Sequence, residues 1–139
     1  MEKICFKKND TKICNREITR GDLILVNFPD VGGSVQAGVR PAIVIQNNIG
    51  NKYSPCLIVA PLTSNTSKNK TYFPTHVLLH KTSGVAKTSI ALCEQLSTIS
   101  KAKIVNYLGH LTPNEMRRID QAICISLALT DVSANQKLA

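Results

Sequence analysis

An arginine and a threonine at the two ends of a predicted hairpin form the pattern in this sequence that best suits chemistry. Arg40 precedes Pro41 at the head of one apolar run, and a second run, 56–60, ends shortly before Thr63. The turn-rich segment 47–55 joins the runs, which is typical of two antiparallel strands. Because the midpoint of positions 40 and 63 falls inside that segment, we expect Arg40 and Thr63 to lie roughly opposite each other. A guanidinium beside a hydroxyl suits the binding of a phosphate group.

The composition is that of one small folded domain with a basic surface. The 139 residues carry a net charge of +8, 43% of them are hydrophobic, and Trp is absent. A charge of this sign favours a polyanionic ligand, either nucleic acid or an acidic protein, and a merely solvated basic face is the alternative. No apolar stretch reaches membrane-spanning length and no signal-peptide core is present, so we expect a cytoplasmic protein without membrane association.

Five cysteines are present without the spacing of a metal site. They are Cys5, Cys14, Cys56, Cys93 and Cys124. The last three lie inside apolar runs, where a reduced cysteine behaves as a small hydrophobic residue. The first two could pair or bind metal with a partner chain, but no His or second Cys stands at ligand spacing. We therefore expect free thiols, no metal and no cofactor.

Short apolar segments separated by turns predict a small β-barrel. Strands or strand-like runs are expected at 23–28, 42–45, 56–60, 75–79, 89–93, 96–99 and 104–111, with a single helical turn at 101–103. The loop 29–38 contains three glycines, which permit positive φ and a close approach of the backbone to a ligand. It is not a nucleotide-binding loop, because neither the GKS/T ending nor a following helix is present.

A helix is predicted to close the domain. Thr112 suits the N-cap, Pro113 the first helical position, and Glu115 completes a capping box. An apolar stripe at helical spacing follows, formed by Met116, Ile119, Ile123 and Leu127. Nearly every side chain from 122 to 129 is apolar, so one sheet face cannot cover the helix. We expect a homodimer contact there, or cover by a long loop of the same chain.

The domain is predicted to span residues 20–131. Residues 1–19 are polar and basic with no clear period, and we interpret them as an arm that is partly ordered on the domain surface. Residues 132–139 are predicted to fray. The polar segment 64–71 contains Lys68 and Lys70, which either contact phosphates nonspecifically or form a solvated linker.

Short stretches at consistent spacing over most of the chain resemble the MazF/PemK family of toxin endoribonucleases. They are 20–22, 38–41, 44–47, 54–55, 63, 74–77, 92–95 and 125–129. The resemblance implies an SH3-like β-barrel with a C-terminal helix, acting as a homodimer. It also implies cleavage of single-stranded mRNA at short sequences without metal, and inhibition by a cognate MazE-like antitoxin whose acidic, flexible tail occupies the RNA groove.

The resemblance also implies roles for particular residues. The catalytic arginine of the family falls on Arg40 and its catalytic threonine on Thr63, the pair selected by the hairpin geometry. Ser34 and Gln36 match RNA-contacting positions of the first loop, and Gln95 matches a position near the substrate. RNA can be cleaved by attack of its 2′-hydroxyl on the adjacent phosphorus, and we hypothesise that Arg40 stabilises charge and protonates the leaving oxygen while Thr63 donates a hydrogen bond. Which group removes the proton of the 2′-hydroxyl stays open: Arg40 in unusual surroundings, a water or a group of the RNA.

Other readings of the same residues stay open at this point. Arg40 could form a surface ion pair, and Glu94 could act as a base, although a lone carboxylate at a strand end is usually structural. His76, His80 and His110 invite a two-histidine ribonuclease, but structural or surface roles are favoured because no two are spaced as a pair. The alternative functions are a gyrase-poisoning toxin on the same fold and a noncatalytic RNA-binding barrel.

Overall fold

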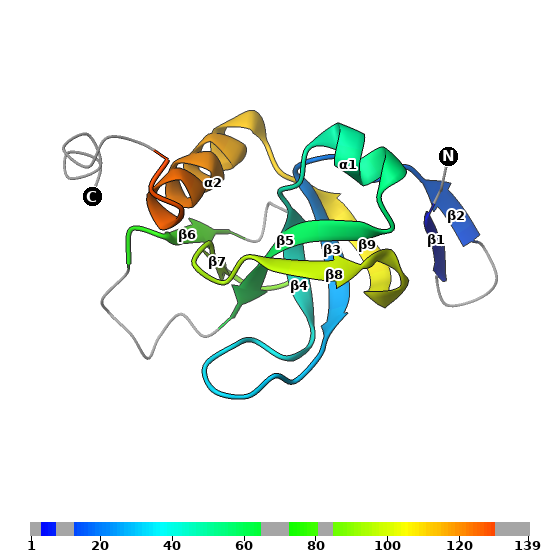
Figure 1. The fold of residues 1–139 in the computed structure, drawn as a ribbon, viewed down its shortest axis with the longest axis horizontal. Coiled ribbons are helices and arrows are strands. Elements are labelled where there is room, and N and C mark those ends of the chain that lie inside the picture. Colours follow the sequence, from blue (N-terminus) through cyan, green and yellow to red (C-terminus); the bar gives the residue numbers. More distant parts are fainter. Residues whose placement is uncertain (1–3, 8–12, 65–72, 81–84, 130–139) are drawn as a thin grey trace.

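The computed structural model describes residues 4–7, 13–64, 73–80 and 85–129, with side chains from Arg16 onward. A seven-stranded antiparallel sheet carries one long helix, α2, over part of one face (Figure 1). Its strands are β3 (Asp22–Phe28), β4 (Gly38–Val44), β5 (Cys56–Thr63), β6 (His76–Leu79), β7 (Ser89–Leu92), β8 (Ser97–Ser100) and β9 (Ile104–His110). The helical segments are α1 (Asn48–Tyr53), the 3₁₀ turn η2 (Lys101–Lys103) and α2 (Pro113–Ser126). The predicted mainly-β fold with a C-terminal helix is confirmed.

The sheet branches at β5 and is not closed. Its strand order is β6-β7-β5-β4-β3-β9, and β8 pairs with the first half of β5 while β7 pairs with its end. Within the described ranges no ladder joins β6 to β9, so the sheet of the predicted SH3-like barrel is open between these two strands.

Both faces of the central strands are buried, which explains their near-continuous apolar sequence. On β3, Leu23 packs into a cluster under α2, whereas its neighbour Ile24 packs into a second cluster on the opposite face. The same alternation separates Ile43 from Ala42 on β4. Two small cores therefore hold the strands that carry the site described below.

The connection between β4 and β5 contains a short helix that the sequence did not predict. The segment 47–55 was expected to be a turn, but α1 fills most of it. The side chain of Asn47 caps this helix by accepting a hydrogen bond of 2.8 Å from the backbone N–H of Gly50. Asn51, which is 2% exposed, exchanges hydrogen bonds with Gln46, so tertiary contacts hold α1 in place.

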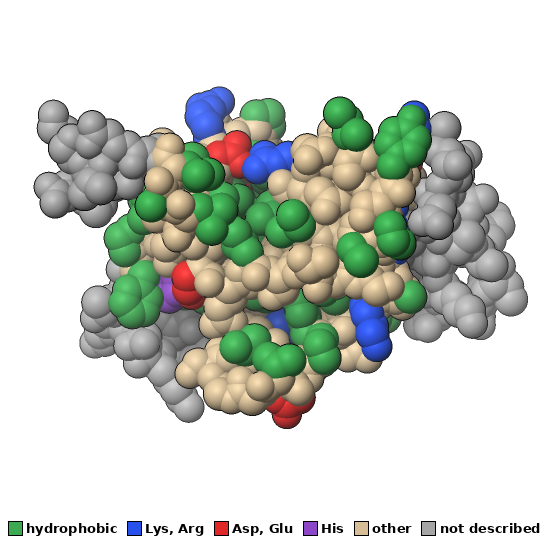
Figure 2. All heavy atoms as spheres, viewed as in Figure 1, with side chains coloured by type: hydrophobic (Ala, Val, Ile, Leu, Met, Phe, Trp, Pro, Cys, Tyr) green, Lys and Arg blue, Asp and Glu red, His purple; other side chains and the backbone are tan. Residues whose placement is uncertain are grey.

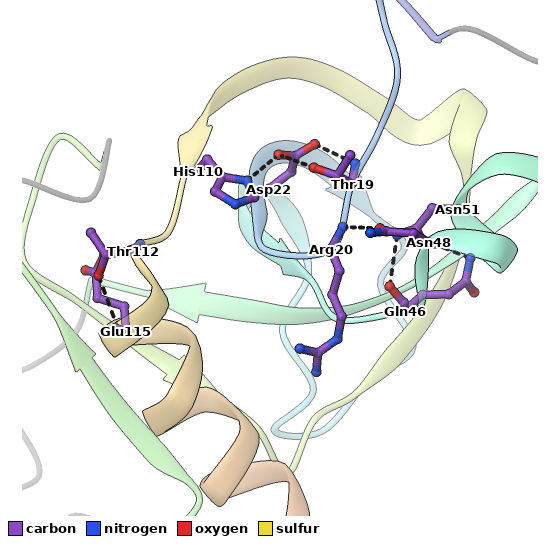
Figure 3. A network of polar contacts seen from close by, with 9 residues as sticks. All are labelled: Thr19, Arg20, Asp22, Gln46, Asn48, Asn51, His110, Thr112 and Glu115. Carbon is purple, nitrogen blue, oxygen red and sulfur yellow. Dashed lines mark hydrogen bonds and ion pairs between the residues drawn. The ribbon is translucent and has the colours of Figure 1, made fainter.

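The start of α2 is the one predicted from the sequence. The N–H of Glu115 donates to Oγ1 of Thr112 at 3.2 Å, and the N–H of Thr112 donates to Oε1 of Glu115 at 2.9 Å (Figure 3). Ile119 and Ala122 are buried against the sheet. Leu127, the C-cap residue, is 52% exposed, so the single chain does not supply the cover that the sequence predicts for this end of the helix.

A polar network ties the start of β3 to three other elements (Figure 3). The carboxylate of Asp22 accepts from the N–H of Thr19 at 2.8 Å and lies 2.7 Å from Nδ1 of His110. The N–H of Arg20 donates to Asn48 in α1, and its guanidinium pairs with Asp120 in α2 at 2.6 Å. Gly21 has a φ of 94°, and a Cβ there would lie 3.1 Å from the His110 ring, so any other residue would be strained at this position.

The N-terminal segment forms a two-stranded hairpin, β1 (Ile4–Lys7) and β2 (Ile13–Arg16), on the side of the sheet away from α2 (Figure 1). The guanidinium of Arg16 lies 3.8 Å above the Tyr107 ring of β9, and Ile18 is buried in the second core.

The predicted frayed tail, 132–139, and the Lys68/Lys70 segment lie outside the described residues. No helix in the described part of the chain has the length and apolar character needed to span a membrane.

Candidate active site

Arg40 lies in β4 and Thr63 ends β5, two strands that pair with each other. Ala42 pairs with Pro61, and Val44 pairs with Val59. These pairs end at Ala42 and Pro61, and the same offset continued two residues further would set Arg40 opposite Thr63. Directly paired residues of antiparallel strands project from the same face, so this offset would put the two side chains on one face of the sheet. Both residues are half-buried, so the pair lies at the surface end of the sheet without being fully solvated.

The guanidinium of Arg40 is held by the loop that precedes it. Its Nε and Nη2 donate to the carbonyl oxygen of Ala37 at 3.0 and 2.7 Å. Its Nη1 donates to Oε1 of Gln36 and lies 3.5 Å from the carbonyl oxygen of Leu62. The guanidinium plane is therefore fixed by acceptors from the loop and from β5. Among the described residues no acidic side chain forms an ion pair with it, so its positive charge is available to an anion.

The other predicted site residues belong to the same network. Oε1 of Gln95 accepts from the backbone N–H of Gln36 at 3.0 Å, and Nε2 of Gln95 donates to the carbonyl oxygen of Ser34 at 3.1 Å. Ser34, Gln36, Gln95 and Arg40 are thus brought together in space. Gln95 accepts one hydrogen bond from the loop and donates another to it, so it anchors the loop as well as lying next to the site.

A pocket of about 290 Å³ opens beside Arg40. Its lining residues are Val39, Arg40, Pro41, Leu62, Ser64, Val85, Ala86, Lys87 and Ser89. None of them is acidic, and two are cations. The sequence analysis did not single out Lys87, because its proximity to Arg40 depends on the pairing of β7 with β5. A basic residue just before the strand 89–92 is the only signal in the sequence, and it is a weak one.

The histidines do not converge on this pocket. His76 lies 3.0 Å from Glu94, whose other carboxylate oxygen accepts from the Thr75 hydroxyl at 2.7 Å. His110 contacts the buried Asp22 instead, and His80 is exposed after the end of β6. These separate carboxylate contacts give His76 and His110 structural roles, and the two-histidine reading is wrong. Glu94 is one of the two carboxylates in these contacts, so it has a structural role as well.

The described cysteines are free thiols, as predicted. They are Cys56, Cys93 and Cys124. Burial, with Glu94 and Asp120 nearby, raises the pKa of Cys93 to about 12, so it stays neutral and unreactive at neutral pH. The side chains of Cys5 and Cys14 lie outside the description. In the described ranges no three His, Cys, Asp or Glu residues gather as ligands for a metal ion.

Comparisons with known proteins place this geometry in a family. Residues 19–127 match the family described as PemK-like, MazF-like toxin of type II toxin-antitoxin system. The chain is 44% identical over 115 residues to Endoribonuclease EndoA of Bacillus subtilis (strain 168), covering 82% of this chain and 97% of that protein.

Solved structures share the fold. MazF from Deinococcus radiodurans superimposes with a TM-score of 0.69 at 22% identity, covering 81% of this chain and 98% of its own. An endoribonuclease in complex with its cognate antitoxin from a mycobacterial species gives a TM-score of 0.66 at 24% identity, covering 82% and 98%. With the match of the family model over most of its length, this chain belongs to the PemK-like, MazF-like toxin family of type II toxin–antitoxin systems.

Proposed function

We propose that this chain is a toxin endoribonuclease that cleaves single-stranded mRNA at a short recognition sequence without a metal ion. The observation that carries the proposal is the guanidinium of Arg40, which Ala37 and Gln36 hold beside a pocket without acidic lining residues. The register of β4 and β5, continued beyond its last pair, supports Thr63 as its partner. The similarity to a relative named an endoribonuclease supports the reaction class. We assign the activity to residues 20–131, in line with the extent of the family match.

The proposed reaction uses the RNA itself as the nucleophile. The 2′ oxygen bonds to the adjacent phosphorus as its hydroxyl loses a proton, and the bond to the 5′ oxygen breaks as that oxygen gains one. The products are a 2′,3′-cyclic phosphate and a 5′-hydroxyl. Negative charge grows on the phosphoryl oxygens in between, and a group with preorganised N–H donors stabilises it.

Arg40 and Thr63 divide this work. The guanidinium stays charged at neutral pH and matches the geometry of a phosphate, so Arg40 stabilises the added charge and protonates the leaving 5′ oxygen. A guanidinium that gives up a proton must recover one in the same turnover. The proton released by the 2′-hydroxyl balances the one that Arg40 gives to the leaving oxygen. Thr63 donates its hydroxyl hydrogen to the same phosphate. Three further residues contact the RNA: Ser34, Gln36 and Gln95.

Three further properties complete the proposal. The protein acts as a homodimer in the cytoplasm. Its activity is blocked by a cognate, MazE-like antitoxin whose acidic segment competes with RNA for the basic surface; structures of relatives with their antitoxins support this partner class. The net charge of +8 suits both polyanionic ligands.

The test is cleavage of a defined RNA by the purified protein in the presence of EDTA. The wild type should give fragments with site-specific 5′-hydroxyl ends, which polynucleotide kinase labels without prior phosphatase treatment. Arg40→Ala and Thr63→Val should each lower kcat by roughly 10²-fold or more, because each removes a donor to the transition state. Arg117→Ala, which removes an exposed arginine of α2, is the matched control and should cleave normally.

Circular dichroism should show that both site variants keep the wild-type fold. Normal turnover by Arg40→Ala, or cleavage that stops with EDTA, would contradict the mechanism. If the wild type binds RNA without cleaving it, the noncatalytic barrel is the better reading. Inhibition of DNA gyrase in the absence of RNA cleavage would favour the gyrase-poisoning toxin.

A further inference from the structure

Two cations, Arg40 and Lys87, line the same pocket, whose other lining residues are apolar or carry hydroxyl groups. The family resemblance and the reaction proposed above use only the first. A pocket with two positive charges and no lining carboxylate suits an anion that extends past a single phosphate group.

The backbone of Lys87 is fixed at the end of the sheet where the Arg–Thr pair lies. The hydroxyl of Ser89, which is 4% exposed, donates to the carbonyl oxygen of Lys87 at 2.9 Å. Ile90, the second residue of β7, pairs with Thr63 of β5. The start of β4, the end of β5 and the approach to β7 therefore meet at one edge, and each supplies a polar group: Arg40, Thr63 and Lys87.

The two cations differ in the contacts that they already make within the protein. Arg40 donates to Ala37, Gln36 and Leu62, which hold its guanidinium in one place. Lys87 is exposed, and its ammonium forms no ion pair with any residue that the structure describes. A rigid cation suits the reacting phosphate, whereas a long, unconstrained lysine suits a neighbouring phosphate that only needs to be held.

We propose that Lys87 is a positioning residue that binds a backbone phosphate of the RNA next to the one that reacts. The inference rests on the proposed function. RNA is favoured over an acidic protein because a strand that places its scissile phosphate on Arg40 must carry its next phosphate along the same pocket. Because this contact exists before and during the reaction, it strengthens binding of substrate and transition state alike.

The test measures binding and cleavage separately for Lys87→Gln, Lys87→Arg and the control Lys103→Gln, which removes the same charge from the exposed η2 turn outside the pocket. Binding uses an oligonucleotide that carries a 2′-deoxy sugar at the mapped cleavage site and therefore lacks the nucleophile. For Lys87→Gln we expect affinity to fall by roughly fivefold, KM to rise by the same factor, and kcat to stay near that of the wild type.

Salt dependence separates a phosphate contact from a general structural role. A plot of log affinity against log salt concentration should lose about 0.7 from its slope in Lys87→Gln, since one fewer counterion is displaced from a single strand. Lys87→Arg should restore the slope, and Lys103→Gln should keep it.

An unchanged slope and affinity in Lys87→Gln, in a wild type that cleaves RNA, would overturn the inference and leave the proposed function standing. Weakened binding of poly-L-glutamate with unchanged RNA binding would also overturn it and assign Lys87 to an acidic protein partner. A wild type that neither binds nor cleaves RNA would instead reject the proposed function.

Discussion

The side chain of Gln36 decides how freely Arg40 can meet a phosphate. Its Oε1 accepts from Nη1 of Arg40, while its backbone N–H donates to Gln95, so the loop and the guanidinium hold each other. An amide oxygen is a neutral acceptor that a phosphate can displace. A carboxylate at the same place would form an ion pair with Arg40 and would also repel the substrate.

Gln36→Glu should therefore lower kcat/KM for RNA cleavage by roughly tenfold or more, with little change in the free energy of unfolding. Gln36→Ala, which removes the acceptor without adding charge, is the matched comparison and should lose less activity. Initial rates on a short RNA and urea unfolding curves measure the two quantities. Equal losses in both variants would show that the charge on Arg40 is not what position 36 controls.

At the scale of elements, the loop 29–38 lies at the opposite end of β3 and β4 from α1 (Figure 1). Both ends of this strand pair are fastened by side-chain amides: Asn51 and Gln46 at the α1 end, and Gln95 at the loop end. The loop contains Gly32 and Gly33 with positive φ values, so its backbone alone does not favour one conformation. The two hydrogen bonds with Gln95 constrain it, in addition to those that Arg40 donates to Ala37 and Gln36.

Gln95→Ala should release the loop and leave the sheet intact. We expect faster amide hydrogen exchange at residues 34–37, a higher KM for RNA and an unchanged exchange rate in β3 and β5. Gln46→Ala is the control, because it loosens the α1 end and should leave the loop amides as they are. Unaltered exchange at 34–37 in Gln95→Ala would mean that other contacts hold the loop.

Local signals in the sequence were enough for most elements. The capping box at Thr112 depends only on neighbouring residues, so the start of α2 was predictable. The pairing of β4 with β5 was predictable because the two apolar runs are joined by a short connection, and the opposition of Arg40 and Thr63 stays a prediction from that register. The helix α1 was not predictable, because a contact between residues distant in sequence helps to hold it. The ammonium of Lys101 donates to the backbone carbonyl oxygen of Asn51 at 2.6 Å. Lys87 was missed for the same reason.

At the scale of the whole molecule, one chain leaves part of its sheet uncovered. Ile58 lies on the same face of β5 as Ala60 and Leu62, which are buried, but it is itself 39% exposed. The end of α2 adds Leu127 and Leu129, which are 52% and 67% exposed. Hydrophobic atoms gather between α2 and the middle of the sheet in Figure 2. An apolar surface of this kind is typical of an interface between protein chains.

We expect this surface to join two copies of the chain, as the sequence of 122–129 predicted. Leu127→Asp should shift the protein toward the monomer, because a dimer would bury the new carboxylate without a partner. Sedimentation velocity over a range of concentrations measures the shift. Val31→Asp, which changes a 66% exposed apolar residue in the loop before β4, is the matched control and should sediment like the wild type. A Leu127→Asp variant that stays dimeric would place the interface on another face of the molecule, whereas a wild type that is monomeric at every concentration would remove the homodimer from the proposed function.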